Sequence, residues 1–283
     1  MNSAPSVSRT ALTLPLSIDW EDWFQLCFPP FDRPGSLDRF EDRLQLATER
    51  TLALCEDLGA TATWFCLGDQ SRRHPALLRR IAAAGHEIAL HGLTHQRATE
   101  LQPEAFRAFV RDGKALLEDL SGAAVVGFRA PEWSLRGPAA GYVHLLPELG
   151  FRYDSSRAPL GILGDPGWSR EAQLLAPGLW ELPPPVAGLG AVTVPLWGWA
   201  MRLLPGPWLR QRILAQAEAA AGNPLVLHPW ELDPSQPPLP PGTPFGHRFV
   251  HSAGLRGLEA RLRELWSGLR LIPLGAWVEG RRA

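Results

Sequence analysis

The stretch "LPLSIDWEDWF", residues 14–24, changes character half-way along its length. It begins as an apolar, strand-like run and then places three acidic side chains close together, Asp19, Glu21 and Asp22, with aromatic residues beside them. Carboxylates crowded against apolar surface repel one another and resist dehydration, so an ordinary hydrophobic core does not select them. A bound cation relieves this repulsion. We therefore expect a buried strand whose end contributes to a cation site.

Strand-like and helix-like segments alternate along the rest of the chain. Short apolar runs such as "ATATWFCLG" (60–68) and "HEIALH" (86–91) are typical of buried parallel strands. Longer amphipathic runs, such as 37–59 and 103–122, are typical of helices. Regular alternation of this kind predicts a parallel sheet, and about seven or eight units favour closure into a distorted (β/α) barrel.

The alternation continues almost from end to end, which favours a single domain over 1–283 with a catalytic core over about 12–280. The region 159–207 is rich in Pro, Gly and Trp and is the least regular, although "GLWELPPP" and "AVTVPLWGW" resemble strands. The Pro-rich segment 233–246 cannot be regular structure and is predicted to be a surface loop.

Composition excludes several classes of protein. The chain has 283 residues, of which 45% are hydrophobic, and this suits a globular protein with a large core. Its net charge of -1 gives no general attraction to nucleic acid or an anionic membrane. No apolar run approaches the roughly 20 residues of a transmembrane helix. Three cysteines without CxxC spacing argue against a disulfide framework, and no signal peptide is evident, so a cytoplasmic location is expected.

Ionisable residues follow several of the predicted strands. In βα barrels the catalytic groups lie at the carboxyl ends of strands and in the loops that follow. We therefore expect five of them to converge on one rim: Asp19, His91, Arg129, Asp154 and His228.

The motif "HGLTH" places His91 and His95 four residues apart, just beyond a predicted strand. If the chain turns into a helix there, both imidazoles lie on one side and can reach one ion. Asp19 and Glu21 face the same side of a continued strand, and Asp22 faces away. Two carboxylates and two imidazoles suit a divalent ion such as zinc. The alternative is a solvated surface turn beside an acidic loop.

Two further motifs offer catalytic groups. In "FRAPEW", the guanidinium of Arg129, beside Pro131, can orient a catalytic carboxylate, or it is simply structural. In "LVLHPWELD", His228 is placed to donate a proton, or it is a core histidine. Three tryptophans are candidate platforms for sugar rings, with simple packing as the alternative: Trp133, Trp199 and Trp230.

Five stretches of the sequence, taken together in their order, resemble polysaccharide deacetylases of the NodB-homology type, carbohydrate esterase family four. They are "SIDWEDWF", "HEIALHGLTHQ", "GFRAPEWSL", "GFRYDSS" and "LHPWELD". The branch associated with exosortase and exopolysaccharide loci is the most similar. The resemblance covers most of the chain from about Leu14. It implies a distorted (β/α) barrel that hydrolyses N-acetyl groups on amino sugars with the help of a metal ion, so the implied partner is an N-acetylated oligo- or polysaccharide.

The resemblance also implies catalytic roles. By position, Asp19 matches the base, Arg129 the arginine that tethers the base, and His228 the general acid. A backbone N–H near Trp20 or Trp133 is the expected oxyanion donor. The candidate substrate-binding residues are Trp20, Pro131, Trp133 and Trp230.

His91 and His95 match the metal-binding histidines of the family. Many members have two adjacent aspartates, of which the second is a metal ligand, whereas this chain has Asp-Trp-Glu-Asp. The metal carboxylate is therefore Glu21, favoured by strand alternation, or else Asp22.

Two features depart from the pattern. Glu132 stands where many relatives have a small hydroxyl residue, so an altered substrate groove is expected. The carboxylate partner of His228 is not evident, and Asp154 and Glu181 are the candidates. Two other functions remain open: a cyclic amide or imide hydrolase on the same barrel, and a barrel that binds carbohydrate without turnover.

Overall fold

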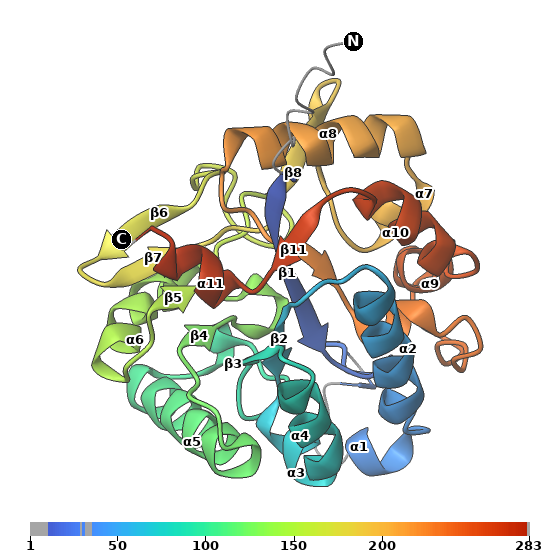
Figure 1. Ribbon diagram of the computed structural model, residues 1–283. Helices are drawn as coiled ribbons and strands as arrows, with labels where there is room; N and C mark the ends of the chain where they lie inside the picture. Colours follow the sequence, from blue (N-terminus) through green and yellow to red (C-terminus); the bar gives the residue numbers. More distant parts are fainter. Residues whose placement is uncertain (1–10, 29, 32–35, 282–283) are drawn as a thin grey trace.

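The computed structural model describes residues 11–28, 30–31 and 36–281. Within these residues the main sheet has the strand order β10-β1-β2-β3-β4-β5-β7-β6, and β11 also pairs with β1 (Figure 1). All of its pairs are parallel except the antiparallel pair of β6 and β7. The strands are β1 Thr13–Trp20, β2 Thr63–Cys66, β3 Glu87–Leu90, β4 Gly127–Phe128, β5 Tyr153–Asp154, β6 Gln173–Ala176, β7 Leu179–Glu181, β10 Leu225–Leu227 and β11 Arg270–Ile272.

The first strand, β1, pairs with three other strands of this sheet. Its early residues pair with β11 and its later residues pair with β10, while β2 lies along its other side. The curled sheet ends at β6 and β10, which do not pair with each other in the described part of the chain. The structure is thus the predicted distorted barrel, left open at one side.

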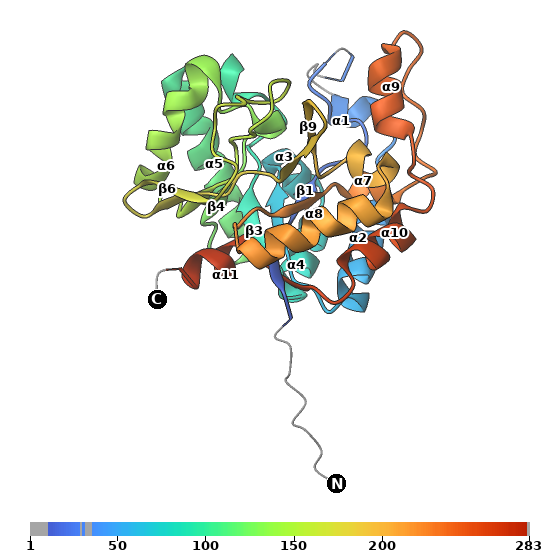
Figure 2. The ribbon, with the colours of Figure 1, turned by 90° about the horizontal axis from the view of Figure 1, so that it is seen from above.

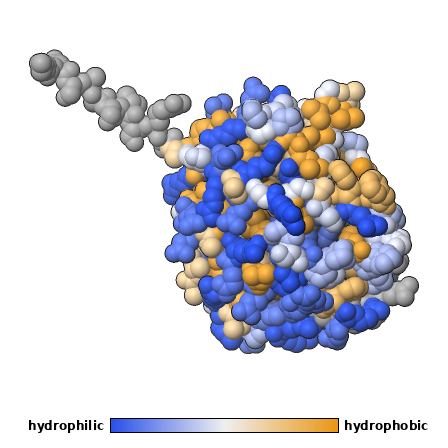
Figure 3. Space-filling model, turned by 90° about the vertical axis from the view of Figure 1, so that its right-hand side faces the viewer, coloured by the Kyte–Doolittle hydropathy of each residue, from blue (hydrophilic) through white to orange (hydrophobic). Residues whose placement is uncertain are grey.

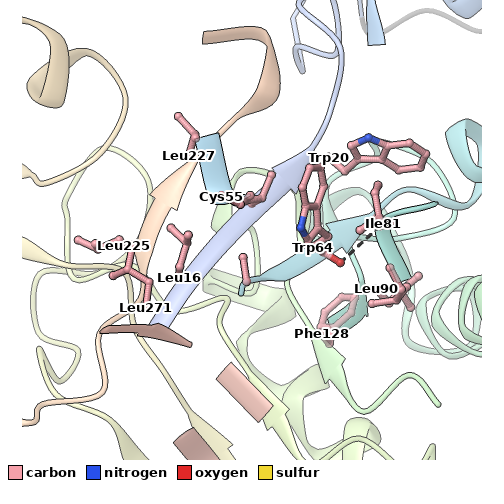
Figure 4. Close-up of a cluster of buried hydrophobic side chains, with 14 of the residues drawn as sticks. Leu16, Trp20, Cys55, Trp64, Ile81, Leu90, Phe128, Leu225, Leu227 and Leu271 are labelled. Carbon is pink, nitrogen blue, oxygen red and sulfur yellow. Dashed lines mark hydrogen bonds between the residues drawn. The ribbon is translucent and has the colours of Figure 1, made fainter. Parts of the chain in front are cut away.

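Alternation along β1 separates two environments. Leu16, Ile18 and Trp20 belong to the main hydrophobic cluster, which lies between the sheet and helices such as α2 (Leu44–Asp57) (Figure 4). Ser17 and Asp19 have the opposite orientation and are also buried. The same strand therefore contributes to the core with one face and directs polar groups into the barrel with the other.

Most of the helices lie on the outside of the sheet (Figure 1). Besides α2, the α-helices of the described residues are α1 Ser36–Arg39, α3 Gly68–Arg73, α4 Pro75–Ala83, α5 Pro103–Ser121, α6 Leu145–Glu148, α7 Trp199–Leu203, α8 Gly206–Ala219, α9 Phe245–Ser252, α10 Leu258–Trp266 and α11 Leu274–Glu279. Short 3-10 helices span η1 Ala98–Glu100, η2 Pro131–Trp133, η3 Gly137–His144 and η4 Pro229–Leu232.

The helix predicted over 37–59 is interrupted. The backbone N–H of Arg43 donates to Asp22 Oδ2 at 2.8 Å, and Trp23 Nε1 donates to the backbone oxygen of Glu41 at 2.9 Å. These contacts hold the chain between α1 and α2 outside a helical conformation, so α2 begins only at Leu44.

The irregular region 159–207 forms two antiparallel hairpins. One is β6 with β7, and the other is β8 (Val186–Leu189) with β9 (Val192–Pro195). The strands β7 and β9 lie in the two segments that resembled strands, whereas β6 and β8 were not predicted. The Pro-rich segment is irregular as far as Pro244, and the helix α9, which was not predicted, begins at Phe245.

The outer surface is mixed in character. Figure 3 views the side on which α2, α9 and α10 lie in Figure 1, and its apolar surface gathers mainly toward the upper right. Figure 2 shows α1, α9 and β9 on one side of the molecule, the side toward which β1 runs. Among the described helices, none has both the length and the apolar character that crossing a bilayer demands.

Candidate metal centre and active site

The carboxylate of Asp19 lies inside the barrel and is only 2% exposed. Arg129, which follows β4, donates from Nη1 to Asp19 Oδ1 at 2.5 Å and to Ser17 Oγ at 3.0 Å. Its Nη2 donates to Ser155 Oγ at 2.8 Å, and its guanidinium lies 4.2 Å from the ring centre of Phe65. A guanidinium held by so many contacts fixes the carboxylate in one orientation and supplies the opposite charge. The structure therefore brings Asp19 and Arg129 together, as expected.

A second carboxylate follows the end of β1. The backbone N–H of Glu21 donates to the backbone oxygen of Asp19 at 2.9 Å. This tight turn keeps the Glu21 side chain close to the Asp19 carboxylate. Glu21 Oε1 lies 2.7 Å from His91 Nε2 and 3.0 Å from His95 Nε2. One ligand atom from each of these three residues lies within 4.8 Å of the others. Glu21, His91 and His95 thus form a compact cluster.

The two histidines converge without a helix. The residues from His91 to His95 form a loop after β3, so the two imidazoles meet without the helical turn that was considered for this motif. Gly92 has a φ of 111°, a conformation that side-chain-bearing residues rarely adopt, and this turn redirects the chain. A Cβ atom at Gly92 would also come within 2.7 Å of the Phe109 ring.

The donor set fits a divalent cation. His91 Nδ1 lies 2.8 Å from the backbone oxygen of Arg129, which can only accept, so Nδ1 carries the proton and Nε2 is available as a ligand. A buried carboxylate and two imidazoles are a ligand set that zinc accepts. Glu21, His91 and His95 are the residues that could hold such an ion.

The charges of this cluster are strongly linked. Burial opposes ionisation of Glu21, but His95 and His91 outweigh it and hold the pKa of Glu21 well below its usual value. Burial likewise disfavours the charged form of His95, but Glu21 and the nearby Cys27 outweigh it and raise the pKa of His95.

His228 completes the site from the end of β10. Its Nε2 lies 3.7 Å from Asp19 Oδ2, and Asp19, Glu21 and His228 each offer an atom within 4.8 Å of the other two. Its Nδ1 lies 3.1 Å from Glu231 Oε2. Burial disfavours the imidazolium, but Glu231 outweighs it and raises the pKa of His228 to about 9. His228 therefore carries its proton at neutral pH.

Glu231 is the partner that sequence reasoning missed. It lies in η4, three residues after His228, and also accepts from the His228 backbone N–H at 3.2 Å. This reciprocal arrangement is a capping box, and its signal was the His-x-x-Glu spacing in "HPWEL". Burial raises the pKa of Glu231, but His228 and Arg202 outweigh it and lower that pKa.

The two carboxylates proposed as partners of His228 lie elsewhere. Asp154 on β5 and Glu181 on β7 are register partners, and their side chains interact with each other. Asp154 Oδ1 also accepts from Ser156 Oγ, and Glu181 Oε1 accepts from the backbone N–H of Arg157 at 3.0 Å. Asp154 therefore pairs with Glu181 and Ser156, and the carboxylate partner of His228 is Glu231.

Asp22 is not part of the cluster. Its Oδ1 accepts from the backbone N–H of Trp23 and its Oδ2 from that of Arg43, both at 2.8 Å. Burial raises the pKa of Asp22 to about 7. The structure thus assigns Asp22 to the start of α2 and leaves Glu21 as the carboxylate of the cluster.

The candidate substrate-binding residues separate into two groups. Trp20 is fully buried, and its Nε1 donates to Thr48 Oγ1 of α2 at 2.8 Å, so its side chain is a core residue (Figure 4). The backbone N–H of Trp133 donates to the Ala130 oxygen at 3.0 Å, so it is already engaged and not available as the expected oxyanion donor.

The other aromatic candidates lie nearer the site. The rings of Trp133 and Trp197 are 5.0 Å apart, and Trp133 also lies 5.6 Å from the guanidinium of Arg129. Trp230 is 9% exposed and its ring centre is 5.6 Å from that of His228. Pro131 is buried in η2, and Trp199 is half-buried at the start of α7.

Family comparisons agree with this geometry. Residues 38–150 match the family model for polysaccharide deacetylase, a range that includes His91, His95 and Arg129. This part of the chain is thus similar to a polysaccharide deacetylase domain. Residues 155–278, which include His228, match a domain of unknown function, DUF3473. Strands from both ranges pair within the one sheet of this deacetylase fold.

Individual relatives show how far the likeness extends. A peptidoglycan deacetylase-like protein of Gibberella zeae is 34% identical over 109 residues, which cover 38% of this chain and 31% of that protein. A peptidoglycan deacetylase of Helicobacter pylori is 28% identical over 125 residues, covering 44% of this chain and 42% of that protein. The chain thus spans less than half the length of these curated relatives.

Among solved structures, one named as a polysaccharide deacetylase from Mycobacterium smegmatis covers 100% of this chain and 94% of its own, with a TM-score of 0.63 and 23% identity. This likeness shows a shared fold.

Proposed function

We propose that this chain is a metal-dependent hydrolase that removes N-acetyl groups from the amino sugars of an oligo- or polysaccharide. The observation that carries the proposal is the position of Asp19 and His228 beside the Glu21–His91–His95 cluster. Hydrolysis of an amide needs a proton acceptor for water, a proton donor for the amine and stabilisation of negative charge on the carbonyl oxygen. The deacetylase domain and the names of its relatives support an N-acetyl substrate.

Glu21, His91 and His95 would hold the metal ion, and zinc is the ion that this ligand set suits best. When bound, such an ion polarises the acetyl carbonyl and lowers the pKa of water.

The chain itself supplies the proton transfers. Asp19, held in place by Arg129, accepts a proton from the water that attacks the acetyl carbon. His228, protonated at neutral pH, donates its Nε2 proton to the amine nitrogen as the carbon–nitrogen bond breaks. Acetate and a free amino sugar leave. General acid–base groups of this kind each contribute about 10²–10⁴-fold to a rate.

The side chains around these groups are apolar. Trp133 and Trp197 belong to a buried cluster that also includes Val226 of β10, the strand that ends next to His228. Trp230 lies on the other side of His228 in sequence and packs against its ring. We infer that these rings exclude water around the acetyl group and contact the sugar.

The decisive experiment measures acetate release from N-acetylglucosamine oligomers, with and without a chelator and after addition of zinc. We expect activity that the chelator removes and zinc restores, and that Asp19→Asn abolishes. Equal turnover by Asp19→Asn and the parent protein would contradict the assignment. Opening of hydantoin-type rings without acetate release would favour the imide hydrolase, and oligosaccharide binding without any turnover would favour a binding barrel.

A further inference from the structure

The two histidines of the metal cluster have different partners at their outer nitrogens. His91 Nδ1 faces a backbone oxygen, that of Arg129, at 2.8 Å. His95 Nδ1 faces a thiol instead, with Cys27 Sγ at 3.2 Å. A metal-binding histidine usually donates its other ring N–H to a carboxylate, a carbonyl or water, and this contact fixes its tautomer and its orientation. A buried thiol in that position is unusual and needs its own explanation.

The thiol is placed to accept a proton from the ring. Cys27 Sγ donates to the backbone oxygen of His95 at 3.4 Å, so its proton points away from the imidazole. Its lone pairs then face Nδ1, which keeps the proton on that nitrogen. Nε2, which lies 3.0 Å from Glu21 Oε1, is left available as a ligand. Cys27 thus contacts both the ring and the backbone of His95.

Cys27 is itself held by an acidic side chain. Its backbone N–H donates to Glu132 Oε1 at 3.2 Å, and Glu132 Oε2 accepts from Arg97 Nε at 2.8 Å. Arg97 comes two residues after His95, so the contacts form a closed ring around the His95 loop. Glu132 has a φ of 50°, a conformation that glutamate rarely adopts. The surroundings therefore maintain a strained backbone in which Glu132 points toward the Cys27 loop.

We propose that Cys27 is the positioning residue for the metal ligand His95, and that Glu132 fixes Cys27 in that role. This inference rests on the proposed metal site. It also gives Glu132 a purpose: its carboxylate is engaged with Cys27 and Arg97 and supports the centre from outside. Loss of such a supporting contact typically costs about 10–100-fold in metal affinity.

The experiment measures zinc affinity of the full chain by competition with a chromophoric chelator, using zinc alone as the probe. We expect Cys27→Ala to weaken binding by about 10–100-fold. Cys27→Ser keeps an acceptor and should recover part of that loss. Cys55→Ala is the matched control, because Cys55 is a buried thiol in α2 outside the cluster, and its zinc affinity should equal that of the parent.

A second variant guards against a folding defect. Glu132→Ala leaves Cys27 in place but frees its loop, and we expect a smaller loss of zinc affinity in the same direction. Thermal unfolding of each zinc-free variant shows whether it is folded. The inference is overturned if the zinc affinity of folded Cys27→Ala falls by less than about tenfold. It is also overturned if Cys55→Ala loses as much zinc affinity as Cys27→Ala. If Cys27→Ala does not fold, an unchanged zinc affinity of Glu132→Ala overturns it. If the parent protein binds no zinc, the proposed function is refuted as well. If the parent binds zinc and releases acetate, the proposed function stands and only the role given to Cys27 is refuted.

Discussion

His228 and Glu231 are joined twice. Glu231 Oε2 lies 3.1 Å from His228 Nδ1 and also accepts from the His228 backbone N–H at 3.2 Å. His228 is the N-cap of the 3-10 helix η4 and Glu231 lies within it, three residues later. This local structure keeps the Glu231 carboxylate next to the imidazole. The opposite nitrogen, Nε2, is thereby directed toward Asp19.

This pairing predicts the alkaline limit of activity. The pKa of His228 is raised to about 9, chiefly because Glu231 outweighs the effect of burial. The imidazolium is therefore present below pH 9 and lost above it, and kcat should fall as pH rises through about 9. Glu231→Gln removes the negative charge and should move this limb about 1–3 units lower. A kcat–pH profile checks it, with the exposed Glu264→Gln as control. An unshifted limb in Glu231→Gln would rule out His228 as the acid.

The neighbouring carboxylates Glu21 and Asp22 are predicted to respond differently to substitution. Glu21→Gln removes the anionic member of the metal cluster, so bound zinc should fall to a small fraction of the parent's. Asp22→Asn should retain zinc, because Asp22 instead accepts two backbone N–H groups at the start of α2. It loses one of these acceptors, at a cost of about 1–3 kcal/mol in the free energy of unfolding. Zinc content and urea unfolding measure the two effects; zinc loss in Asp22→Asn alone would reverse the assignment.

Much of the site could be predicted because it depends on strand alternation and on strand ends. Asp19 and His91 follow from these local rules, as does the placement of Arg129. Glu21 lies beyond the end of β1, and the turn between its backbone N–H and the backbone oxygen of Asp19 brings it to the same site. The rules fail where local patterns compete. Glu231 is a helix-capping residue as well as an ion-pair partner, and the spacing alone does not distinguish the two roles.

Asp154 shows a second limit of prediction from local sequence patterns. It ends a strand of only two residues, and its orientation depends on the pairing of β5 with β7, which brings Glu181 beside it. The hairpins of region 159–207 are missed for the same reason, since the pairing of short, Pro- and Gly-rich strands is set by distant contacts rather than by local pattern. Between His91 and His95 the chain forms a loop in which Gly92 makes the turn, and not the helical turn that would also have brought the two imidazoles together.

Arg129 is predicted to be essential for stability as well as for orientation of the base. It is fully buried and its guanidinium contacts Asp19. Removing one partner of a buried ion pair leaves the other charge uncompensated, at a cost of about 3–5 kcal/mol. Arg129→Gln should therefore lower the free energy of unfolding by this amount. The control is Arg107→Gln, because Arg107 pairs with Glu148 at the surface, and its effect should stay within about 1 kcal/mol. Similar losses in both variants would contradict the buried role.

A final prediction concerns Glu181, which interacts with Asp154 inside the sheet. Burial and the adjacent Asp154 raise the pKa of Glu181 well above its usual value. Folding therefore requires Glu181 to hold a proton that the unfolded chain releases above its pKa of about 4.3. The contribution of protonated Glu181 to the free energy of unfolding is complete below about pH 4.3. It falls by about 1.4 kcal/mol per pH unit as the pH rises from there toward the pKa of Glu181 in the folded protein. Glu181→Gln needs no proton and can still donate to Asp154, so it should be more stable than the parent at pH 8 and comparable at pH 4. Urea unfolding at both values tests this, and a variant less stable than the parent at pH 8 would show that Glu181 is ionised in the folded protein.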